Sequence, residues 1–315
     1  MLKILIFLVM SLISYSLGIN YISYSVESSH YLHQMMIGLS FLIGLTASLN
    51  QFKEIFLRNK KLIMIFFGCK VLVSPIVSFS IYVLFGCNPN LLSLIVIGIV
   101  PSAMISVAFS KIYGGNYLLN IVCTLLMILI TPLSIPILSK MYLGKFIDFD
   151  SINIMLSTFN LVVLPMIVGI ILNSICSNKL NHHIIDYLII AIVSMMIFSI
   201  SQNQMKIPDL IYTVMPIILY ILSMYLISIL LLGLFDFTKY NQIAFKHEMS
   251  LSDAALAIIL SRDILNQSVL IPVEAAILQI LMLILLNFIG ILRKLHNLKF
   301  ILCIKQLIKH KNINI

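Results

Sequence analysis

The chain has few charged residues, and this scarcity excludes most soluble folds. Only 10% of its 315 residues are Asp, Glu, Lys or Arg, whereas 61% are hydrophobic. A soluble globular domain carries about 25% charged residues. Long apolar runs replace the missing charge, and many approach the roughly 20 residues with which a helix spans a bilayer. The composition therefore indicates a polytopic membrane protein, and the runs lack the alternation of a barrel strand.

Cysteine and tryptophan are also scarce, which narrows the possible sites. The five cysteines form no CxxC motif and no close pair, so neither a disulfide framework nor a cysteine metal site is indicated. No tryptophan is present, which leaves tyrosine for the membrane interface. The absence of GxxxxGK[ST] argues against direct ATP-driven transport by this chain. We expect no cofactor, apart from a sodium ion considered below.

Ten apolar spans predict an all-α polytopic membrane protein. They cover residues 2–19, 34–49, 62–86, 91–110, 116–139, 153–177, 183–202, 209–234, 241–262 and 269–292. We expect a transmembrane transporter domain over 1–292, made of inverted repeats at about 1–140 and 150–292, and a basic cytoplasmic tail over 293–315. Lys and Arg concentrate on one side if both termini are cytoplasmic. The net charge of +9 then reflects cytoplasmic loops and anionic lipid headgroups rather than nucleic acid.

The fourth span of each half is interrupted by polar or helix-breaking residues. Pro101 and Ser102 interrupt the first, and the stretch from Glu248 to Asp253 interrupts the second. Interrupted helices at matched positions of two inverted halves indicate a transporter binding site. A charged side chain at bilayer depth costs about 2.5–3.5 kcal/mol on insertion scales, so both carboxylates need a partner, a watery cavity or an ion.

Three segments carry distinctive motifs: Gly44-Leu45-Thr46 followed by Phe52, the polar stretch from Pro101 to Pro136, and the stretch from Glu248 to Ala257. In this order they resemble the bile acid:sodium symporter family. Gly44-Leu45-Thr46 followed by Phe52 resembles the family's Met-Gly-Leu-Thr-Leu stretch before a Phe. The polar segment from Pro101 to Pro136 is similar to the family's Pro-Gly-Gly-Thr-Ala-Ser-Asn stretch and the helix after it. Glu248-Met-Ser-Leu-Ser-Asp253-Ala-Ala-Leu-Ala resembles Glu-x-Gly-x-Gln-Asn-x-x-Leu-Ala. The resemblance covers residues 34–290.

The resemblance implies a ten-helix fold with a panel domain, a core domain, and discontinuous fourth and ninth helices that cross. It implies two sodium ions behind the crossing and an organic anion in the cavity between the domains. The chemistry agrees, because oxygen ligands suit sodium and an unwound helix releases backbone carbonyls. Helix N-termini at the crossing would point their positive ends at an anion.

The resemblance also implies roles for individual residues. Glu248 matches the carboxylate that both family sodium sites share, and Ser106 and Thr124 match hydroxyl ligands of the first site. Asn120 replaces a serine there and can still offer an oxygen. Ser252 takes the place of a glutamine in the second site, and Asp253 that of an asparagine at the crossing. The other interruption is expected to contribute substrate-side residues, namely Pro101, Ser102 and Met104.

Lys70 is the largest departure from the family. It replaces a glutamine that helps to bind the second sodium, and its ammonium group would repel an adjacent cation at low dielectric. We expect Lys70 to be a tethered cation paired with Glu248 or Asp253 in place of that sodium. Proton coupling, or transport with no coupling ion, then becomes an alternative to sodium coupling. A purely structural ion pair, or snorkelling to the surface, is the competing interpretation.

The expected function is secondary active transport of a small organic anion, such as a keto acid, a pantothenate precursor or a bile-acid-like carboxylate. We expect a bacterial inner membrane location, contact with membrane lipid, and neither nucleic acid nor an obligatory protein partner. One alternative is arsenite-type efflux. That type usually relies on a cysteine in its fourth helix, whereas Cys123 lies in the fifth span here. Another is an intramembrane enzyme, in which Glu248, Asp253 and Lys70 would form an acid–base group. A third is a family member that no longer transports.

Overall fold

The computed structural model of the chain is helical, as the composition predicted. It describes residues 2–21, 24, 28, 30–47, 49–103, 105–144, 146, 150–176, 182–200, 207–265, 271–272 and 274–288. Four helical stretches within this part are long and apolar enough to cross a bilayer, namely Lys60–Leu84, Tyr117–Leu143, Ser151–Ile175 and Thr213–Gly233. The polytopic all-α class is thereby confirmed, whereas the ten spans and the inverted repeats stay predictions. The predicted tail over 293–315 lies outside the described residues.

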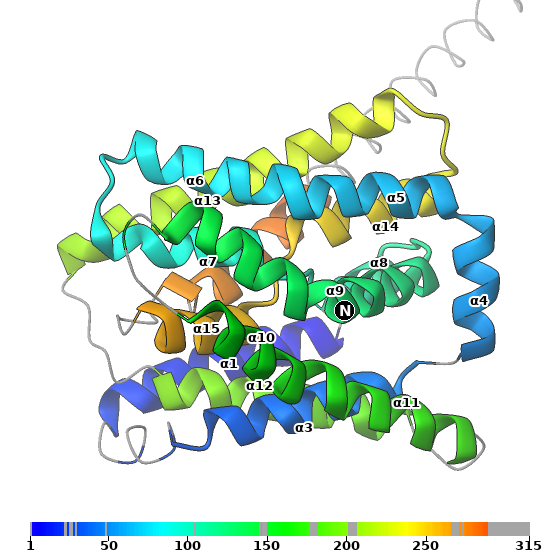
Figure 1. Cartoon of the computed structure of the whole chain (residues 1–315), viewed down its shortest axis with the longest axis horizontal. Helices are drawn as coiled ribbons and strands as arrows, with labels where there is room; N and C mark the ends of the chain where they lie inside the picture. The colour runs from blue at the N-terminus through cyan, green and yellow to red at the C-terminus, as the bar shows by residue number, and fades with distance from the viewer. Residues whose placement is uncertain are drawn as a thin grey trace, which may run out of the picture. The chain divides into compact units, whose positions relative to one another are not determined.

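Two pairs of helices from opposite halves of the sequence pack against each other. α1 (Leu2–Asn20) contacts α12 (His182–Ile200), and α3 (Leu32–Leu45) contacts α11 (Leu164–Cys176). Figure 1 shows these four helices gathered at the bottom of the view. Helices from the first third of the chain thus pair with helices from beyond its midpoint.

Two glycines allow the backbones of α3 and α11 to touch. A Cβ atom at Gly44 would lie 2.2 Å from the carbonyl oxygen of Met166, and one at Gly169 would lie 2.3 Å from that of Phe41. No side chain fits into either space. Small residues at such a contact are typical of membrane helices, because close approach of the backbones maximises van der Waals contact where lipid offers no hydrophobic driving force.

Most of the remaining helices pack against α9 (Tyr117–Leu143). The remaining helices are α4 (Leu49–Arg58), α5 (Lys60–Gly68), α6 (Ser74–Leu84), α7 (Leu92–Ile99), α8 (Ile105–Ile112), α10 (Ser151–Thr158), α13 (Ile207–Gly233), α14 (Lys239–Ser250) and α15 (Ala254–Leu265). α13 packs instead against α6 and α14, and α15 against α7 and α3. α9 contacts α7, α8 and α14, while α6 contacts α7 and α13. A short 3₁₀ turn, Pro89–Leu91, leads into α7.

Two turns are wound as π-helix, and a proline explains each of them. The π turns cover Cys69–Val73 and Phe159–Val163, and Pro75 and Pro165 follow two residues after each. A proline lacks an N–H and its ring collides with the carbonyl four residues earlier. Widening the preceding turn relieves that collision, and such turns are frequent at functional sites. The first of them carries Lys70.

The two interrupted helices break where the sequence indicated and meet at their breaks. α7 ends at Ile99 and Val100 is extended, with φ −70° and ψ 154°. α14 ends at Ser250, and Leu251 is likewise extended, with φ −106° and ψ 128°. The Asp253 N–H donates to the Pro101 carbonyl at 2.8 Å, so one break supplies a backbone partner for the other.

Replacing Gly44 with Ala should destabilise the protein by about 1–3 kcal/mol, the usual cost of overpacking a filled contact. The added methyl group would displace the Met166 carbonyl and separate α3 from α11. A thermal melt in detergent measures the effect. Gly68→Ala is the matched control, because nothing lies within 4 Å of a Cβ atom there and Ala favours helix. Equal melting temperatures for the two variants would contradict the close backbone contact.

Candidate ion and substrate site

The carboxylate of Glu248 accepts four hydrogen bonds in the interior of the described structure. It lies near the end of α14 and is buried. The donors are Ser102 Oγ, Ser106 Oγ, Asn120 Nδ2 at 2.6 Å and Thr124 Oγ1 at 2.7 Å. An ionised carboxylate only accepts hydrogen bonds, so this arrangement suits the charged form of Glu248.

Three separate segments supply these donors. Ser102 belongs to the break after α7, and Ser106 to the first turn of α8. Asn120 and Thr124 are four residues apart on α9, a spacing that places both side chains on one face of a helix. Asn120 Nδ2 also donates to the carbonyl of Ala244 at 3.1 Å, one turn before Glu248. The carboxylate therefore ties α14 to α9 and to the first interruption.

The cluster has the oxygen atoms that a hard monovalent cation requires. Asn120 Oδ1 is buried and has no hydrogen-bond partner among the residues that the structure describes, so it can serve as an acceptor. The hydroxyls of Ser106 and Thr124 can rotate to offer lone pairs, because a hydroxyl both donates and accepts. No group of three His, Cys, Asp or Glu residues forms a metal cluster within the described ranges. Oxygen ligands without imidazole or thiolate suit sodium better than a transition metal.

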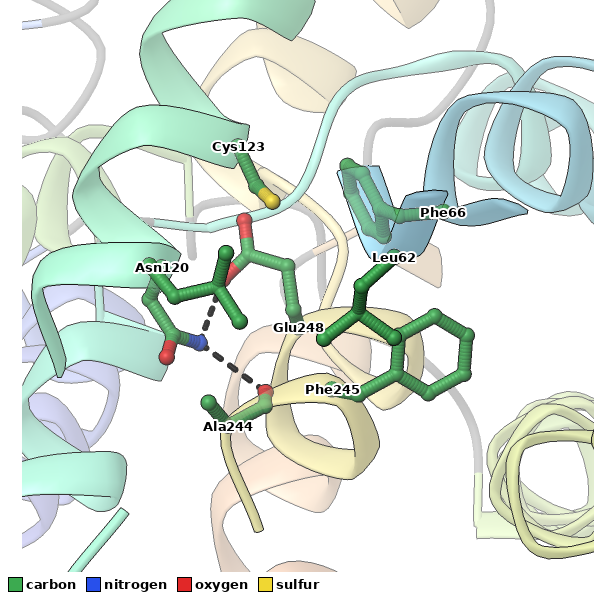
Figure 2. A pocket seen from close by; sticks show the side chains of 8 residues that line it. Leu62, Phe66, Asn120, Cys123, Ala244, Phe245 and Glu248 are labelled. Atoms are coloured by element: carbon green, nitrogen blue, oxygen red, sulfur yellow. Dashed lines mark hydrogen bonds between the residues drawn. The ribbon is translucent and has the colours of Figure 1, made fainter. Parts of the chain in front are cut away.

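A small pocket, with room for about one water molecule, lies beside the carboxylate. Asn120 and Cys123 of α9 and Glu248 of α14 line its polar end, and Leu62 and Phe66 of α5 face them, as Figure 2 shows.

Lys70 is buried, and uncharged oxygen atoms accept its hydrogen bonds. Its ammonium group donates to Ser252 Oγ at 2.9 Å and to the Leu251 carbonyl at 3.3 Å. The expected contact with the second interruption is therefore present, but the hydrogen bonds go to Leu251 and Ser252 rather than to Glu248 or Asp253. The Leu251 carbonyl is available because it lies where the helix is unwound.

A chain of hydroxyl groups continues from Ser252. Tyr220 OH lies 3.0 Å from Ser252 Oγ and 2.8 Å from Ser74 Oγ, which donates to the Gly98 carbonyl at 2.7 Å. Each hydroxyl has one proton, so only one direction satisfies every link: Lys70 to Ser252, then Tyr220, Ser74 and the carbonyl. The Ser252 N–H donates to Gln279 Oε1 at 3.2 Å. No motif in the sequence singled out Ser74, Tyr220 or Gln279, which belong to different helices.

Asp253 caps the helix that follows it. Its Oδ1 accepts hydrogen bonds from the N–H groups of Ala255 at 3.1 Å and Leu256 at 3.3 Å, the standard contacts of an N-cap. The side chain of Asp253 therefore stabilises the start of α15. Its main-chain N–H stabilises the crossing by donating to the Pro101 carbonyl. Met104 lies outside the described residues.

His247 is a buried polar residue that the sequence did not single out. Its Nδ1 lies 3.2 Å from Ser110 Oγ, and its ring packs against Phe109 and Tyr113 at 5.8 and 5.7 Å between centroids. These contacts attach α14 to α8 on the side of the helix next to Glu248. Its sequence context offered no signal, because Lys246 and His247 resemble an ordinary basic helix flank.

Replacing Thr124 with Val should weaken sodium binding roughly tenfold. This is the effect expected from losing one contact about as strong as a net hydrogen bond. The substitution keeps the shape of the side chain but removes one oxygen that faces Glu248. The measurement is the sodium concentration needed to raise the melting temperature of the detergent-solubilised protein. Potassium or choline at matched ionic strength serves as the comparison. Thr131→Val is the control, since Thr131 donates to the Met127 carbonyl of its own helix. A Thr124→Val protein that responds to sodium as wild type does would remove Thr124 from the ligand set.

Comparison with known proteins agrees with this geometry. Residues 32–211 match the model of the Sodium Bile acid symporter family. A rice protein (Oryza sativa subsp. japonica) named "Probable sodium/metabolite cotransporter BASS2, chloroplastic" is 28% identical over 139 residues. The alignment covers 43% of this chain and 33% of the rice protein, so the chain spans about a third of that relative. The family match extends over more than half of the chain, and the resemblance predicted from the motifs is confirmed: the chain belongs to the Sodium Bile acid symporter family.

Proposed function

We propose that the chain is a secondary active transporter that moves a small organic solute together with sodium by alternating access. The observation that carries this proposal is the buried Glu248 carboxylate, with hydroxyl and amide groups from three segments around it at the crossing of two interrupted helices. Membership of a symporter family and a sodium/metabolite cotransporter as a relative support it. Both also favour a transporter over an intramembrane enzyme.

The cluster explains how a sodium ion can be bound and released. Without the ion, four donors satisfy Glu248, so the carboxylate is not left buried and unpaired. When sodium binds, Ser106 and Thr124 turn their lone pairs towards it and Asn120 contributes Oδ1, which has no other partner in the described part of the chain. The exchange of one set of contacts for another keeps the two states close in energy. Transport requires such a balance, because binding must be favourable enough to load the ion and weak enough to release it.

Sodium at Glu248 would act directly on the crossing. Ser102 donates to Glu248 from the same break that provides the Pro101 carbonyl to Asp253. A cation that changes the hydrogen bonds of Ser102 therefore changes the support of the break where the solute is expected. In coupled transport, the ion must alter the free energy of the conformation that binds the solute. The hydrogen bond from Ser102 to Glu248 would connect the ion to that conformation.

Lys70 takes the place of a second cation in this proposal. Its ammonium group donates to the Leu251 carbonyl and to Ser252, oxygen atoms that a second sodium would otherwise use. Two adjacent cations repel strongly in a medium of low dielectric. One sodium ion per cycle follows. Proton coupling through Lys70 is the second candidate, because a buried lysine that changes partners can exchange a proton.

For the cargo, the family resemblance favours a small organic carboxylate, such as a keto acid, a pantothenate precursor or a bile-acid-like molecule. The proposed location is a bacterial inner membrane, with cytoplasmic termini and without an obligatory protein partner. Arsenite efflux is less well supported. Cys123 does line the pocket beside Glu248, but it lies on the continuous helix α9 rather than on an interrupted one.

Replacing Lys70 with Gln should open the second cation position and raise the sodium Hill coefficient of uptake from about 1 towards 2. Uptake of small carboxylates into proteoliposomes measures this, with sodium and pH gradients imposed separately. Lys111→Gln is the matched control, because Lys111 is exposed and stacks on Tyr117. Identical sodium dependence in Lys70→Gln and wild type would refute the role of Lys70. Wild-type uptake driven by the pH gradient alone would favour proton coupling.

A further inference from the structure

Three asparagine side chains join the starts of α5, α9 and α14 to one another. Asn241 Nδ2 donates to Asn59 Oδ1 at 2.9 Å, and Asn116 Nδ2 donates to Asn241 Oδ1 at 2.9 Å. Asn59 and Asn116 directly precede α5 and α9, whereas Asn241 lies in the first turn of α14. The Asn116 N–H also donates to the Tyr240 carbonyl at 3.0 Å. We call Asn59, Asn116 and Asn241 the asparagine triad.

The small pocket beside Glu248 lies on the inner side of the triad. Each residue that lines it follows a triad residue by three, four or seven positions, so the two lie on one face of the same helix. Seven residues are about two turns, or roughly 10 Å along a helix axis. The lining residues that matter here are Leu62 of α5, Leu119, Asn120 and Cys123 of α9, and Glu248 of α14. The three helices thus enclose one line from the triad to Glu248.

Polarity and exposure change in order along this line. The triad is partly buried, whereas Leu62 and Leu119, about one turn deeper, are buried. Asn120 comes next and donates to Glu248, as Figure 2 shows. Its Oδ1 accepts no hydrogen bond from the part of the chain that the structure describes. The line therefore contains amide oxygens, an apolar constriction, space for about one water molecule, a further amide oxygen and a carboxylate.

We infer that this line is the passage by which sodium reaches and leaves Glu248, and that the asparagine triad is its gate. The inference rests on the proposed sodium site. Carbonyl oxygens can replace part of the hydration shell of an ion, and hydrophobic constrictions close a passage by excluding water. In the closed triad, Asn59 Oδ1 and Asn241 Oδ1 each accept an N–H group. Breaking these two hydrogen bonds opens the passage and frees both oxygens for the ion.

The charges around the passage make such oxygens necessary. Lys60, Lys111 and Lys239 are exposed close to the triad in sequence or through Tyr117, and the positive ends of three helices lie there as well. Solvent and salt screen these charges only in part. Glu248 is the acidic residue among those that line the pocket, whereas the neighbouring His247 faces α8. A cation is thus attracted by the inner end of the passage and needs neutral oxygen ligands at the outer end.

Cys123 can report whether the passage is open, because its thiol is buried and lines the pocket. The experiment uses the full chain with Cys123 as its only cysteine, the other four being replaced by Ser. The small cation 2-aminoethyl methanethiosulfonate is added in detergent, with sodium or with choline at equal ionic strength, and intact mass gives the modification rate. Asn241→Ala, which removes both side-chain bonds of the triad, should be modified at least tenfold faster than the parent. Sodium should slow modification at least fivefold in both.

Asn59→Ala is the second gate variant, because it removes only one of the two bonds and should also be modified faster. Asn88→Ala is the matched control and should react at the parent rate, since Asn88 caps the Pro89–Leu91 turn by accepting the Asn90 N–H at 3.0 Å. The sodium-dependent melting temperature shows that each variant is folded and tests the sodium site independently of the passage.

Two results would overturn the inference while the sodium site stands. One is modification of both triad variants at the parent rate. The other is modification that sodium does not slow, although sodium raises the melting temperature. If sodium neither raises the melting temperature nor slows modification, the proposed sodium site fails and the inference fails with it.

Discussion

A single backbone hydrogen bond, from the Asp253 N–H to the Pro101 carbonyl, joins the two interrupted helices. An unwound segment inside a membrane leaves backbone groups without helical partners, and each unsatisfied group there costs several kcal/mol. This bond satisfies one group of each break, while Lys70 donates to the Leu251 carbonyl and Gln279 accepts from the Ser252 N–H. Because the two breaks must meet for that reason, the side chains next to them are brought together as well, and Ser102 reaches Glu248 as a direct result. The geometry of the ion cluster is thus a consequence of how the backbone is satisfied.

Buried charges at the crossing are each satisfied by neutral groups. Glu248 receives hydroxyl and amide donors, Lys70 donates to a hydroxyl and a carbonyl, and Asp253 receives backbone N–H groups. A direct ion pair would have fixed two of these side chains to each other and would have been costly to break. Neutral partners can rotate or exchange one by one. That property suits the proposed transport cycle, in which the site alternates between loaded and empty states.

Much of this arrangement could be predicted from the sequence, because it depends on local signals. Apolar runs indicated the membrane helices, and prolines and buried carboxylates indicated where two of them would break. The i, i+4 spacing of Asn120 and Thr124 is enough by itself to assign both side chains to one face of a helix. These features need only composition, periodicity and motif order, and the family resemblance then related them to one another.

The rest depends on contacts between distant parts of the chain. Lys70 and Ser252 are 182 residues apart in the sequence. Only the packing of the π turn Cys69–Val73 against the second break determines that the ammonium group donates to a hydroxyl and not to a carboxylate. Tyr220 and Gln279 lie within apolar helices and have no motif around them, so nothing local distinguishes them from interfacial residues. His247 likewise looked like part of a basic flank, whereas its neighbours on α8 hold it in the interior.

The π turn over Cys69–Val73 has a further consequence for Lys70. A π turn contains about one residue more than an α turn, so it rotates the helix on one side relative to the other by about 100°. Lys70 faces the protein interior, while Leu72 and Ile76 are exposed on the surface that lipid would cover. Loss of one residue from this turn would rotate Lys70 by about 100° relative to the helix that follows. The position of its ammonium group therefore depends on helical phase as well as on the choice of side chain.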